Sequence, residues 1–480
     1  MSASSAQIKR SSRAGVSALM AALLLSGCAT IPNLGAAPQV KPAQAYAASQ
    51  SFQAPAADWP DGAWWTVYGD DQLAALINEA LSGAPDLAQA EARVRQAQAL
   101  AEQSRAATLP QLSAGAQAGV QKQSYNNGIP AAFVPQGWND VGQASLNLSY
   151  EFDFWGKNRA ALAAATSDAE AARADAAAAR LALSTSIASA YADLAQLYAD
   201  RDAATDAVTV RQRTSGLIGE RLGQGLENQS AAEQAHAGLA ASQAQLAAVD
   251  ESIGLTRDRI AALMGQGPDR GLKIGRPMPG AIKAFGLPQG LQADLIGRRP
   301  DVAAARLRAQ AASQRIKSAK AEFYPNVNLS ALIGLQSLGL SSLVKAGSGY
   351  GAVTGALSLP IFSAGRLEGA YRGRRAEYDA AVASYDSTLT HALQDVADVA
   401  VSERALGTRL SRSQEALGAS QRAYDLAQAR YRGGLSPYLD VLTAEDSLIA
   451  NRRAVADLQT RAFALDIDLV RALGGGFQAA

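Results

Sequence analysis

The sequence has very few of the residues on which metal sites and the commonest enzymes depend. One cysteine and two histidines occur among 480 residues. These counts exclude an ordinary His/Cys metal site, a disulfide framework and a Cys-His catalytic pair. We therefore predict a protein that is not an enzyme and that holds no cofactor or metal.

Aromatic residues and net charge are also scarce. Phe, Trp and Tyr make up 6% of the chain, and its formal net charge is +1. A nearly neutral chain gives no sign of a polyanionic partner, so we expect no binding to nucleic acid. Because alanine supplies much of the apolar content, the composition favours long, close-packed helices.

The single cysteine lies at the end of a predicted signal peptide, residues 1–27. Basic residues precede an apolar stretch at 16–25, and LSGC, ending at Cys28, follows at once. The stretch is too short for a membrane-spanning helix. LSGC resembles a bacterial lipobox, which implies cleavage before Cys28 and its modification by lipid such as palmitate. Ala29, in place of Asp, implies sorting to the outer membrane.

A long segment occurs twice. Residues Pro85–Pro110 and Pro300–Pro325 align without gaps, and eight of their 26 positions are identical. Both copies begin with Pro-Asp, which suits the first turn of a helix, and both end with a proline that cannot continue one. Each copy is predicted to be a helix of roughly two dozen residues.

After each copy the apolar period changes from helical to alternating. The alternating segments are 112–121 and 141–152 in the first half and 327–336 and 350–362 in the second. Turn-rich loops separate the members of each pair, so we predict two β-hairpins. Strands of about 10 residues are long enough to cross a bilayer at a tilt.

Very long alanine-rich segments without proline follow, at about 155–222 and 363–431. The spacing of Ile187, Tyr191, Leu194 and Tyr198 predicts an apolar seam along one helix face. Leu389, Leu393 and Val396 begin the same seam in the second copy. Each segment ends in RLGQGL or RYRGGL, where glycine predicts the turn of a helical hairpin. Second helical segments are expected at 228–264 and 437–473.

Four strands of membrane length cannot close a barrel, and an open sheet edge is not tolerated in lipid. We therefore predict that several copies of the chain combine into a shared barrel, with the helices forming a shared tube. A coiled-coil rod would explain the helices but not the hairpins.

Six stretches spread over nearly the whole mature chain resemble the outer-membrane factor family of TolC- and OprM-like channels, and within it the NodT-type efflux lipoproteins. They are WWTVYGDDQLAALINEAL, FDFWGKNRA, DLIGRRPDVAAAR, AEFYPNVNLSALIG, LSLPIFSAGR and YRGGLSPYLDVLTAE. The resemblance implies a mainly α-helical chain with a membrane β part. As a homotrimer it would form a 12-stranded outer-membrane β-barrel, a long periplasmic α-barrel and a mixed equatorial region, which the Trp64 segment, the 267–290 linker and the C-terminus would supply.

The resemblance also implies function: a passive exit duct for drugs and other small amphiphilic compounds in a tripartite efflux pump. Its partners would be a periplasmic adaptor protein and an inner-membrane pump, of the RND type. A type I protein secretion channel is the alternative within the family, and a non-conducting periplasmic scaffold is the alternative outside it.

The family places adaptor docking and the gate at the helical tips. By position, the docking candidates are Gly223, Gly225, Leu226, Gly433, Gly434, Leu435 and Ser436. The glycines could instead be only helix caps. A periplasmic gate would involve Tyr424, Asp425, Gln428, Arg221 and Arg430. Asp425 would form a ring of like charge in a trimer, although the aligned constriction position could be Gln428 and Asp425 a solvated residue.

Two other groups are predicted to have no chemical role. His236 and His391 are isolated on helices, which indicates solvated or interface positions. Arg298, Arg299 and Asp301 resemble a catalytic cluster in their density, but we predict that they start a helix. We predict that the chain divides into a signal peptide (1–27), a lipid-anchored linker (28–63), a first repeat (64–267), an inter-repeat linker (268–292), a second repeat (293–474) and a tail (475–480).

Overall fold

The computed structural model describes residues 31–278 and 285–479. Cys28, Ala29 and part of the predicted equatorial linker lie outside these residues. The chain divides into two compact units, each made of segments from both halves of the sequence. The first comprises the described chain up to Val40 with Arg95–Ala171 and Arg306–Ser384, and the second comprises Lys41–Val94, Ala172–Ala305 and Tyr385–Ala480.

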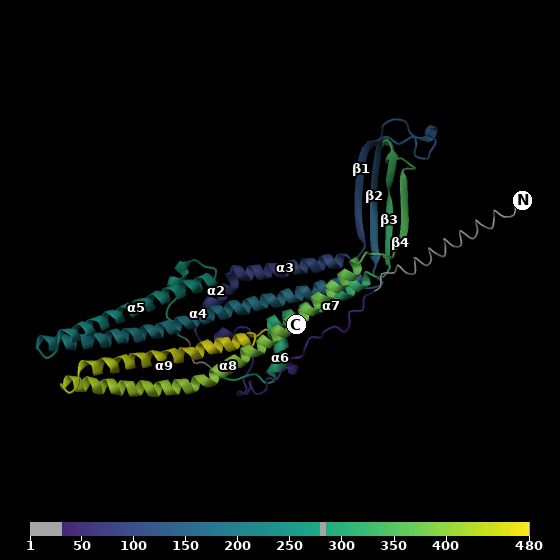
Figure 1. Ribbon diagram of the computed structural model, residues 1–480. Helices are drawn as coiled ribbons and strands as arrows, with labels where there is room; N and C mark the ends of the chain where they lie inside the picture. The colour runs from purple at the N-terminus through teal and green to yellow at the C-terminus, as the bar shows by residue number, and fades with distance from the viewer. Residues whose placement is uncertain (1–30, 279–284, 480) are drawn as a thin grey trace. The chain divides into compact units, whose positions relative to one another are not determined.

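The order of elements repeats once along the chain (Figure 1). The helices are α2 (Asp71–Gly83), α3 (Pro85–Ala106), α4 (Lys157–Gly223), α5 (Gln229–Leu263), α6 (Leu291–Arg298), α7 (Pro300–Ala321), α8 (Arg366–Arg432) and α9 (Tyr438–Ala472). The strands are β1 (Gln111–Gln121), β2 (Asn139–Phe152), β3 (Asn326–Leu338) and β4 (Gly349–Ser358). The repeated segment forms α3 and α7, each of 22 residues, as predicted.

The four strands form one antiparallel sheet in the first unit, in the order β1-β2-β3-β4. Both predicted hairpins are present, and β2 also pairs with β3 over its length, from Val141 opposite Leu338 to Phe152 opposite Val327. β1 and β4 each have one partner strand and therefore form the two edges of the sheet. The predicted strand at 350–362 was too long. β4 ends at Ser358, two residues before Pro360, which has no backbone N–H to donate to a neighbouring strand.

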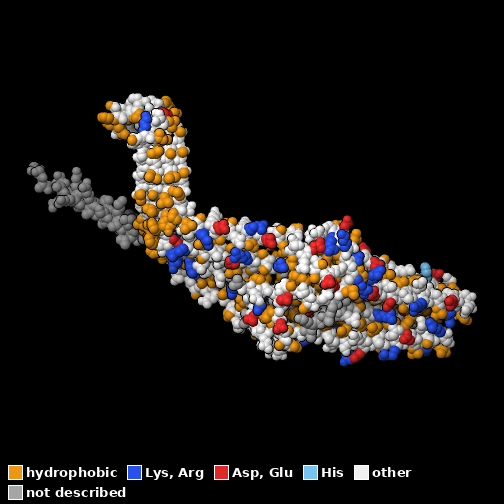
Figure 2. All heavy atoms as spheres, turned by 180° about the vertical axis from the view of Figure 1, so that it is seen from behind, with side chains coloured by type: hydrophobic (Ala, Val, Ile, Leu, Met, Phe, Trp, Pro, Cys, Tyr) orange, Lys and Arg blue, Asp and Glu red, His pale blue; other side chains and the backbone are white. Residues whose placement is uncertain are grey.

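The two faces of the sheet differ in polarity. The register sets Leu146 opposite Ile333, and on the other face it sets Gln143 opposite Gln336. The Gln117 amide donates a hydrogen bond of 2.8 Å to Gln143 on that second face. Figure 2 shows hydrophobic and uncharged side chains over the sheet, whereas Lys, Arg, Asp and Glu side chains gather over the helices. One face is thus suited to lipid and the other to water.

Two antiparallel helical hairpins dominate the second unit, with α4 followed by α5 and α8 followed by α9 (Figure 1). The two long helices have 67 residues each and the two returning helices 35 each. The predicted seams are confirmed: Ile187, Tyr191 and Leu194 are fully buried, and Tyr198 packs against the same core. The seam of the second copy, Leu389 to Val396, is buried as well.

The predicted equatorial segments pack on these helices. Trp64, Trp65 and Tyr68 are buried in the core that includes α4, and Asp70 caps α2 by accepting a hydrogen bond from the Leu73 backbone at 3.1 Å. Ala56, before the Trp64 segment, and Leu287, in the inter-repeat linker, form an isolated parallel β-bridge. The N-terminal segment also binds the chain in the first unit, where the Tyr378 hydroxyl donates to the Pro38 carbonyl at 2.9 Å.

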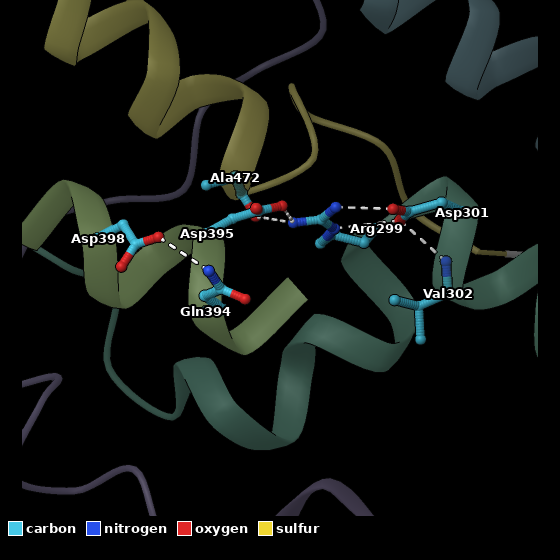
Figure 3. A network of polar contacts seen from close by, with 7 residues as sticks. All are labelled: Arg299, Asp301, Val302, Gln394, Asp395, Asp398 and Ala472. Carbon is cyan, nitrogen blue, oxygen red and sulfur yellow. Dashed lines mark hydrogen bonds and ion pairs between the residues drawn. The ribbon is translucent and has the colours of Figure 1, made fainter. Parts of the chain in front are cut away.

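Arg299 links three helices where α6 meets α7 (Figure 3). It donates to Asp301 at 2.6 Å and to Asp395 of α8 at 2.8 Å, and it reaches the last carbonyl of α9, that of Ala472, at 3.3 Å. Arg299 is buried. Its hydrogen bonds connect α7, α8 and α9, so the structure supports the predicted structural role of this group. Among the described helices, none is both long enough and apolar enough to cross a membrane.

The tip glycines generate the first prediction. Gly225 and Gly434 have φ angles of 73° and 72°, whereas Gly223 does not have a positive φ. Alanine in the left-handed region costs about 1–2 kcal/mol. We expect Gly225→Ala and Gly434→Ala to speed hydrogen exchange of the amides flanking each tip by about 5- to 30-fold. Gly223→Ala, the matched control, has open space for its methyl group and should leave exchange unchanged; equal effects of all three variants would contradict the assignment.

Candidate functional site at the helical tips

The two tips have the same backbone geometry. In the first, the Leu226 N–H donates to the Arg221 carbonyl at 2.8 Å, and in the second the Leu435 N–H donates to the Arg430 carbonyl, also at 2.8 Å. A glycine of positive φ precedes each leucine. This 6→1 bond closes the last turn of a long helix and satisfies a carbonyl that would otherwise lack a partner. The sequence repeat RLGQGL/RYRGGL therefore encodes two copies of one helix-ending turn.

The predicted docking residues form the surface of these turns. Leu226 is 60% exposed and Leu435 is 73% exposed. Gly223, Gly225, Gly433 and Gly434 are exposed as well, and Ser436 is partly buried with its hydroxyl lacking a hydrogen-bond partner among the described residues. Each tip thus presents a solvent-exposed leucine beside solvent-exposed glycines, a combination that suits contact with another protein.

The two tips differ in how the returning helix is capped at its first residue. Asn228 caps α5 by accepting a hydrogen bond from the Ala231 N–H at 3.0 Å. The corresponding position before α9 is Pro437, whose side chain makes no capping bond. Substitution of an Asn cap by a residue that cannot cap costs about 0.5–2 kcal/mol. The first turn is therefore held more firmly by its own side chains than the second.

The predicted gate residues of α8 lie on different faces of that helix. Tyr424 is buried, and its hydroxyl accepts a hydrogen bond from Gln428 at 3.1 Å. Asp425 is exposed and accepts from Gln421 at 2.9 Å. Arg430 is exposed too, and within the described residues of one chain no ion pair joins it or Arg221 to Asp425. A contact of Asp425 with either arginine would have to form between copies of the chain.

Arg221 instead contacts a residue that sequence reasoning missed. Its guanidinium lies 4.6 Å from the ring centre of Tyr431, at the end of α8. The Tyr431 hydroxyl donates to Glu227 of the first tip at 2.8 Å. Burial, together with the adjacent Glu227 carboxylate, raises the pKa of Tyr431 to about 12. The phenol therefore stays protonated at physiological pH and ties the two tips of one chain together.

A second missed group lies further along the hairpins. Glu445 of α9 is 0% exposed, and it accepts a hydrogen bond of 2.9 Å from the Thr214 hydroxyl of α4. Arg211 of α4 pairs with Glu445 at 2.9 Å and also with Asp446. Burial raises the pKa of Glu445, whereas Thr214 and Arg211 act in the opposite direction. The sequence did carry a signal, because Glu445 falls at a seam position between Val441 and Leu448.

The remaining singled-out residues form no chemical site. His236 and His391 are exposed on helices. In the parts of the chain that the structure describes, no group of three His, Cys, Asp or Glu side chains could hold a metal ion.

Comparisons with known proteins identify similar outer membrane and resistance proteins. MdtP, a multidrug resistance outer membrane protein of Escherichia coli K12, is 31% identical over 472 residues, 95% of each chain. The fusaric acid resistance protein FusA of Burkholderia cepacia is 34% identical over 362 residues, which cover 73% of this chain and 67% of FusA. The crystal structure of the outer membrane protein VceC of Vibrio cholerae matches with a TM-score of 0.84 and 46% identity, over 88% of this chain and 100% of that chain.

These matches confirm the resemblance, the fold class, the outer-membrane localisation and the efflux function predicted from the sequence. The family is one of efflux channels and not of enzymes. Its profile, described as outer membrane efflux protein, matches residues 76–266 and 291–475, which is more than half of the chain. The chain therefore belongs to the outer membrane efflux protein family.

Proposed function

We propose that three copies of this chain form the outer-membrane exit duct of a tripartite efflux pump, through which drugs and other small amphiphilic compounds leave passively. A periplasmic adaptor would dock at the helical tips and connect the duct to an inner-membrane pump of the RND type. The observation that carries this proposal is the four-stranded sheet with two open edges.

The strands are of membrane-spanning size. They have 10 to 14 residues, and at about 3.3 Å per residue the longest extends for roughly 46 Å before tilting. Tyr150, Phe152 and Phe154 form consecutive ring contacts at the end of β2, with centroids 4.9 and 5.8 Å apart. An aromatic cluster at a strand end is typical of the girdle at a membrane surface.

The open edges support a shared barrel. Every residue of β1 is exposed, and all but one of β4 are exposed. In hydrocarbon each unpaired N–H and C=O costs several kcal/mol, so β1 of one copy must pair with β4 of another. Three copies supply 12 strands, which leave a water-filled lumen, whereas about eight strands would fill the interior with side chains.

The duct would be anchored and unselective. Lipid at Cys28 would add an acyl anchor to the barrel, and incorporation of labelled palmitate tests this. Because a wide water-filled channel discriminates weakly between compounds, the inner-membrane pump would determine most of the substrate specificity.

The tips would carry the gate. In a trimer the exposed Asp425 appears three times, and a ring of carboxylates either attracts cations or is tied by arginines such as Arg430 of another copy. Tyr424 and Gln428 would hold the helix face that carries the ring.

Adjacent residues of β2 test the membrane assignment. Leu146 and Asn147 lie at one depth but on opposite faces of the sheet. Leu146→Lys should destabilise the membrane-inserted trimer by about 2–4 kcal/mol, because the cation would face lipid. Asn147→Lys, the control, should be tolerated. The measurement is the fraction of heat-modifiable folded trimer on unboiled gels, and equal yields of the two variants would contradict the assignment.

The gate is tested by conductance. Purified wild-type trimer in planar bilayers should show discrete low-conductance events that increase in Asp425→Ala, because the ring of charge is gone. Glu415→Ala removes another exposed carboxylate from the same helix and should change little. If Asp425→Ala behaves like the control, the constriction lies elsewhere, with Gln428 the next position to substitute.

The efflux role is tested in the bacterium that makes the protein. Deletion of the chain should raise accumulation of a fluorescent amphiphilic dye and lower resistance to toxic compounds, while the set of secreted proteins stays unchanged. Expression of the chain should restore both properties. Loss of a secreted protein with unchanged dye accumulation would instead identify a protein secretion channel.

A further inference from the structure

The end of the sheet that adjoins the long helices carries exposed apolar side chains. Phe154 and Trp155 follow β2, and Leu359 and Phe362 follow β4. Phe154 is 65% exposed and Phe362 is 85% exposed. Figure 2 shows a hydrophobic patch where the sheet meets the helices. Next to strands of membrane-spanning length, such a patch is typical of the boundary between hydrocarbon and water.

Exposed cations lie within a few residues of this patch. Lys317 and Lys320 are near the end of α7, and Arg372 is near the start of α8. At 1.5 Å per residue, Lys317 precedes the last residue of α7 by about 6 Å, and Arg372 follows the first residue of α8 by about 9 Å. The headgroup layer on each side of a bilayer is of similar thickness, about 5–8 Å. We call these three residues the basic collar.

The two helix ends that carry the basic collar lie together, beside the apolar patch. Glu322, just beyond α7, forms an ion pair of 3.8 Å with Arg366, the first residue of α8. Tyr324 follows Lys320 by four residues, and its ring stacks on that of Trp155 with centroids 4.7 Å apart. The cations and the exposed aromatic rings therefore belong to one region of the first unit.

The basic collar has no counter-charge of its own. Residues 315–324 and 366–379 contain seven Lys or Arg and four Asp or Glu. All four carboxylates have partners: Glu322 contacts Arg366, Glu368 the Ser363 hydroxyl, Glu377 Arg374, and Asp379 Arg375. Lys317, Lys320 and Arg372 make no ion pair or hydrogen bond with any described residue. The unpaired charge of this region is therefore entirely positive.

We propose that the basic collar binds the phosphodiester headgroups of anionic phospholipids in the periplasmic leaflet of the outer membrane. This inference rests on the proposed function, which places this end of the sheet at that membrane surface. Lys and Arg donate charge-assisted hydrogen bonds to phosphate oxygens, and their long stems allow the charged ends to reach the headgroup layer. An anionic lipid is favoured over a zwitterionic one because the unpaired cations repel an ammonium group.

The strength of this preference follows from the number of cations and from the salt. Each Lys or Arg near an anionic lipid surface strengthens binding by roughly fivefold. The attraction acts over about 10 Å at 0.1 M salt but only about 3 Å at 1 M. A basic collar in the headgroup layer should therefore enrich anionic lipid around the protein at low salt and lose most of that enrichment at high salt.

The test measures lipid preference on the full-length protein in phosphatidylethanolamine vesicles. A trace of spin-labelled phosphatidylglycerol or phosphatidylcholine is added, and the immobilised fraction of each label gives their relative affinity for the protein. Wild-type protein should prefer phosphatidylglycerol about fivefold or more at low salt. Raising the salt to about 1 M should bring the two lipids close to equal.

The variant Lys317→Gln/Lys320→Gln/Arg372→Gln should reduce the preference to about equal affinity, because the unpaired charges are gone. Lys317→Arg/Lys320→Arg/Arg372→Lys keeps every charge and should keep the preference. All three positions are exposed, so heat-modifiable trimer should form in both variants, which confirms that the lipid measurement reports on folded protein.

The matched control removes three exposed cations elsewhere, as Arg213→Gln/Arg409→Gln/Arg422→Gln. These residues lie more than 40 residues beyond the first residues of α4 and α8, which is over about 60 Å along a helix. That distance is several times the range of an unscreened charge at low salt, so the lipid preference should stay at the wild-type value.

The inference is overturned if the basic-collar variant keeps the wild-type preference, or if the control variant loses it equally. It is also overturned if the basic-collar variant changes the cation-to-anion selectivity of the conductance but not the lipid preference, since the cations would then face the lumen. Wild-type protein that immobilises neither lipid would not be inserted, and this result would count against the proposed function itself. Insertion without a preference would contradict only the lipid site.

Discussion

The structure depends on one constraint, that backbone N–H and C=O groups placed in lipid must be paired. A chain that contributes four strands leaves two edges, β1 and β4, with unpaired groups along their whole length. No helix or loop of the described chain pairs with these edges. In the proposed trimer, closure would come from the other copies, and the long helices that follow the strands would become parts of a shared tube.

The internal duplication gives each half of the chain the same set of elements. Each half uses a Pro-Asp helix start, a β-hairpin, an alanine-rich helix of 67 residues and a glycine turn. The two halves differ at their tips. The first tip is capped by Asn228 and the second is not, while Tyr431 and Glu227 bind the tips to each other.

Most elements were predictable because their signals are local. Proline and glycine fixed the ends of α3, α7 and the two hairpins, and the 4-3-4 spacing around Tyr191 identified a seam that is buried. The pairing of β2 with β3 was not predicted, because strands about 200 residues apart carry no local signal of adjacency. The end of β4 was placed too late because Pro360 was read as part of the strand.

The candidate site was predictable only in its location. The glycine turns marked the tips, but the apolar seams were traced only around Tyr191 of α4 and Leu389 of α8. A similar spacing recurs in another register, 4-3-4 at Ala207, Arg211, Thr214 and Ile218 on α4 and 3-4-3 at Tyr438, Val441, Glu445 and Leu448 on α9. A charge of opposite sign at a core position in each helix is a signal for a buried pair, but only the structure shows that the two positions face each other.

The most direct test of this account is a cysteine scan across the edges of the sheet. Ala116→Cys at the centre of β1 is combined in turn with a cysteine at each of positions 351–355 of β4. Within one chain two strands lie between these edges, roughly 14 Å, which is too far for a disulfide. The account predicts that at least one pair gives a covalent trimer on a non-reducing gel. Folded, membrane-inserted protein that remains monomeric at every position would contradict it.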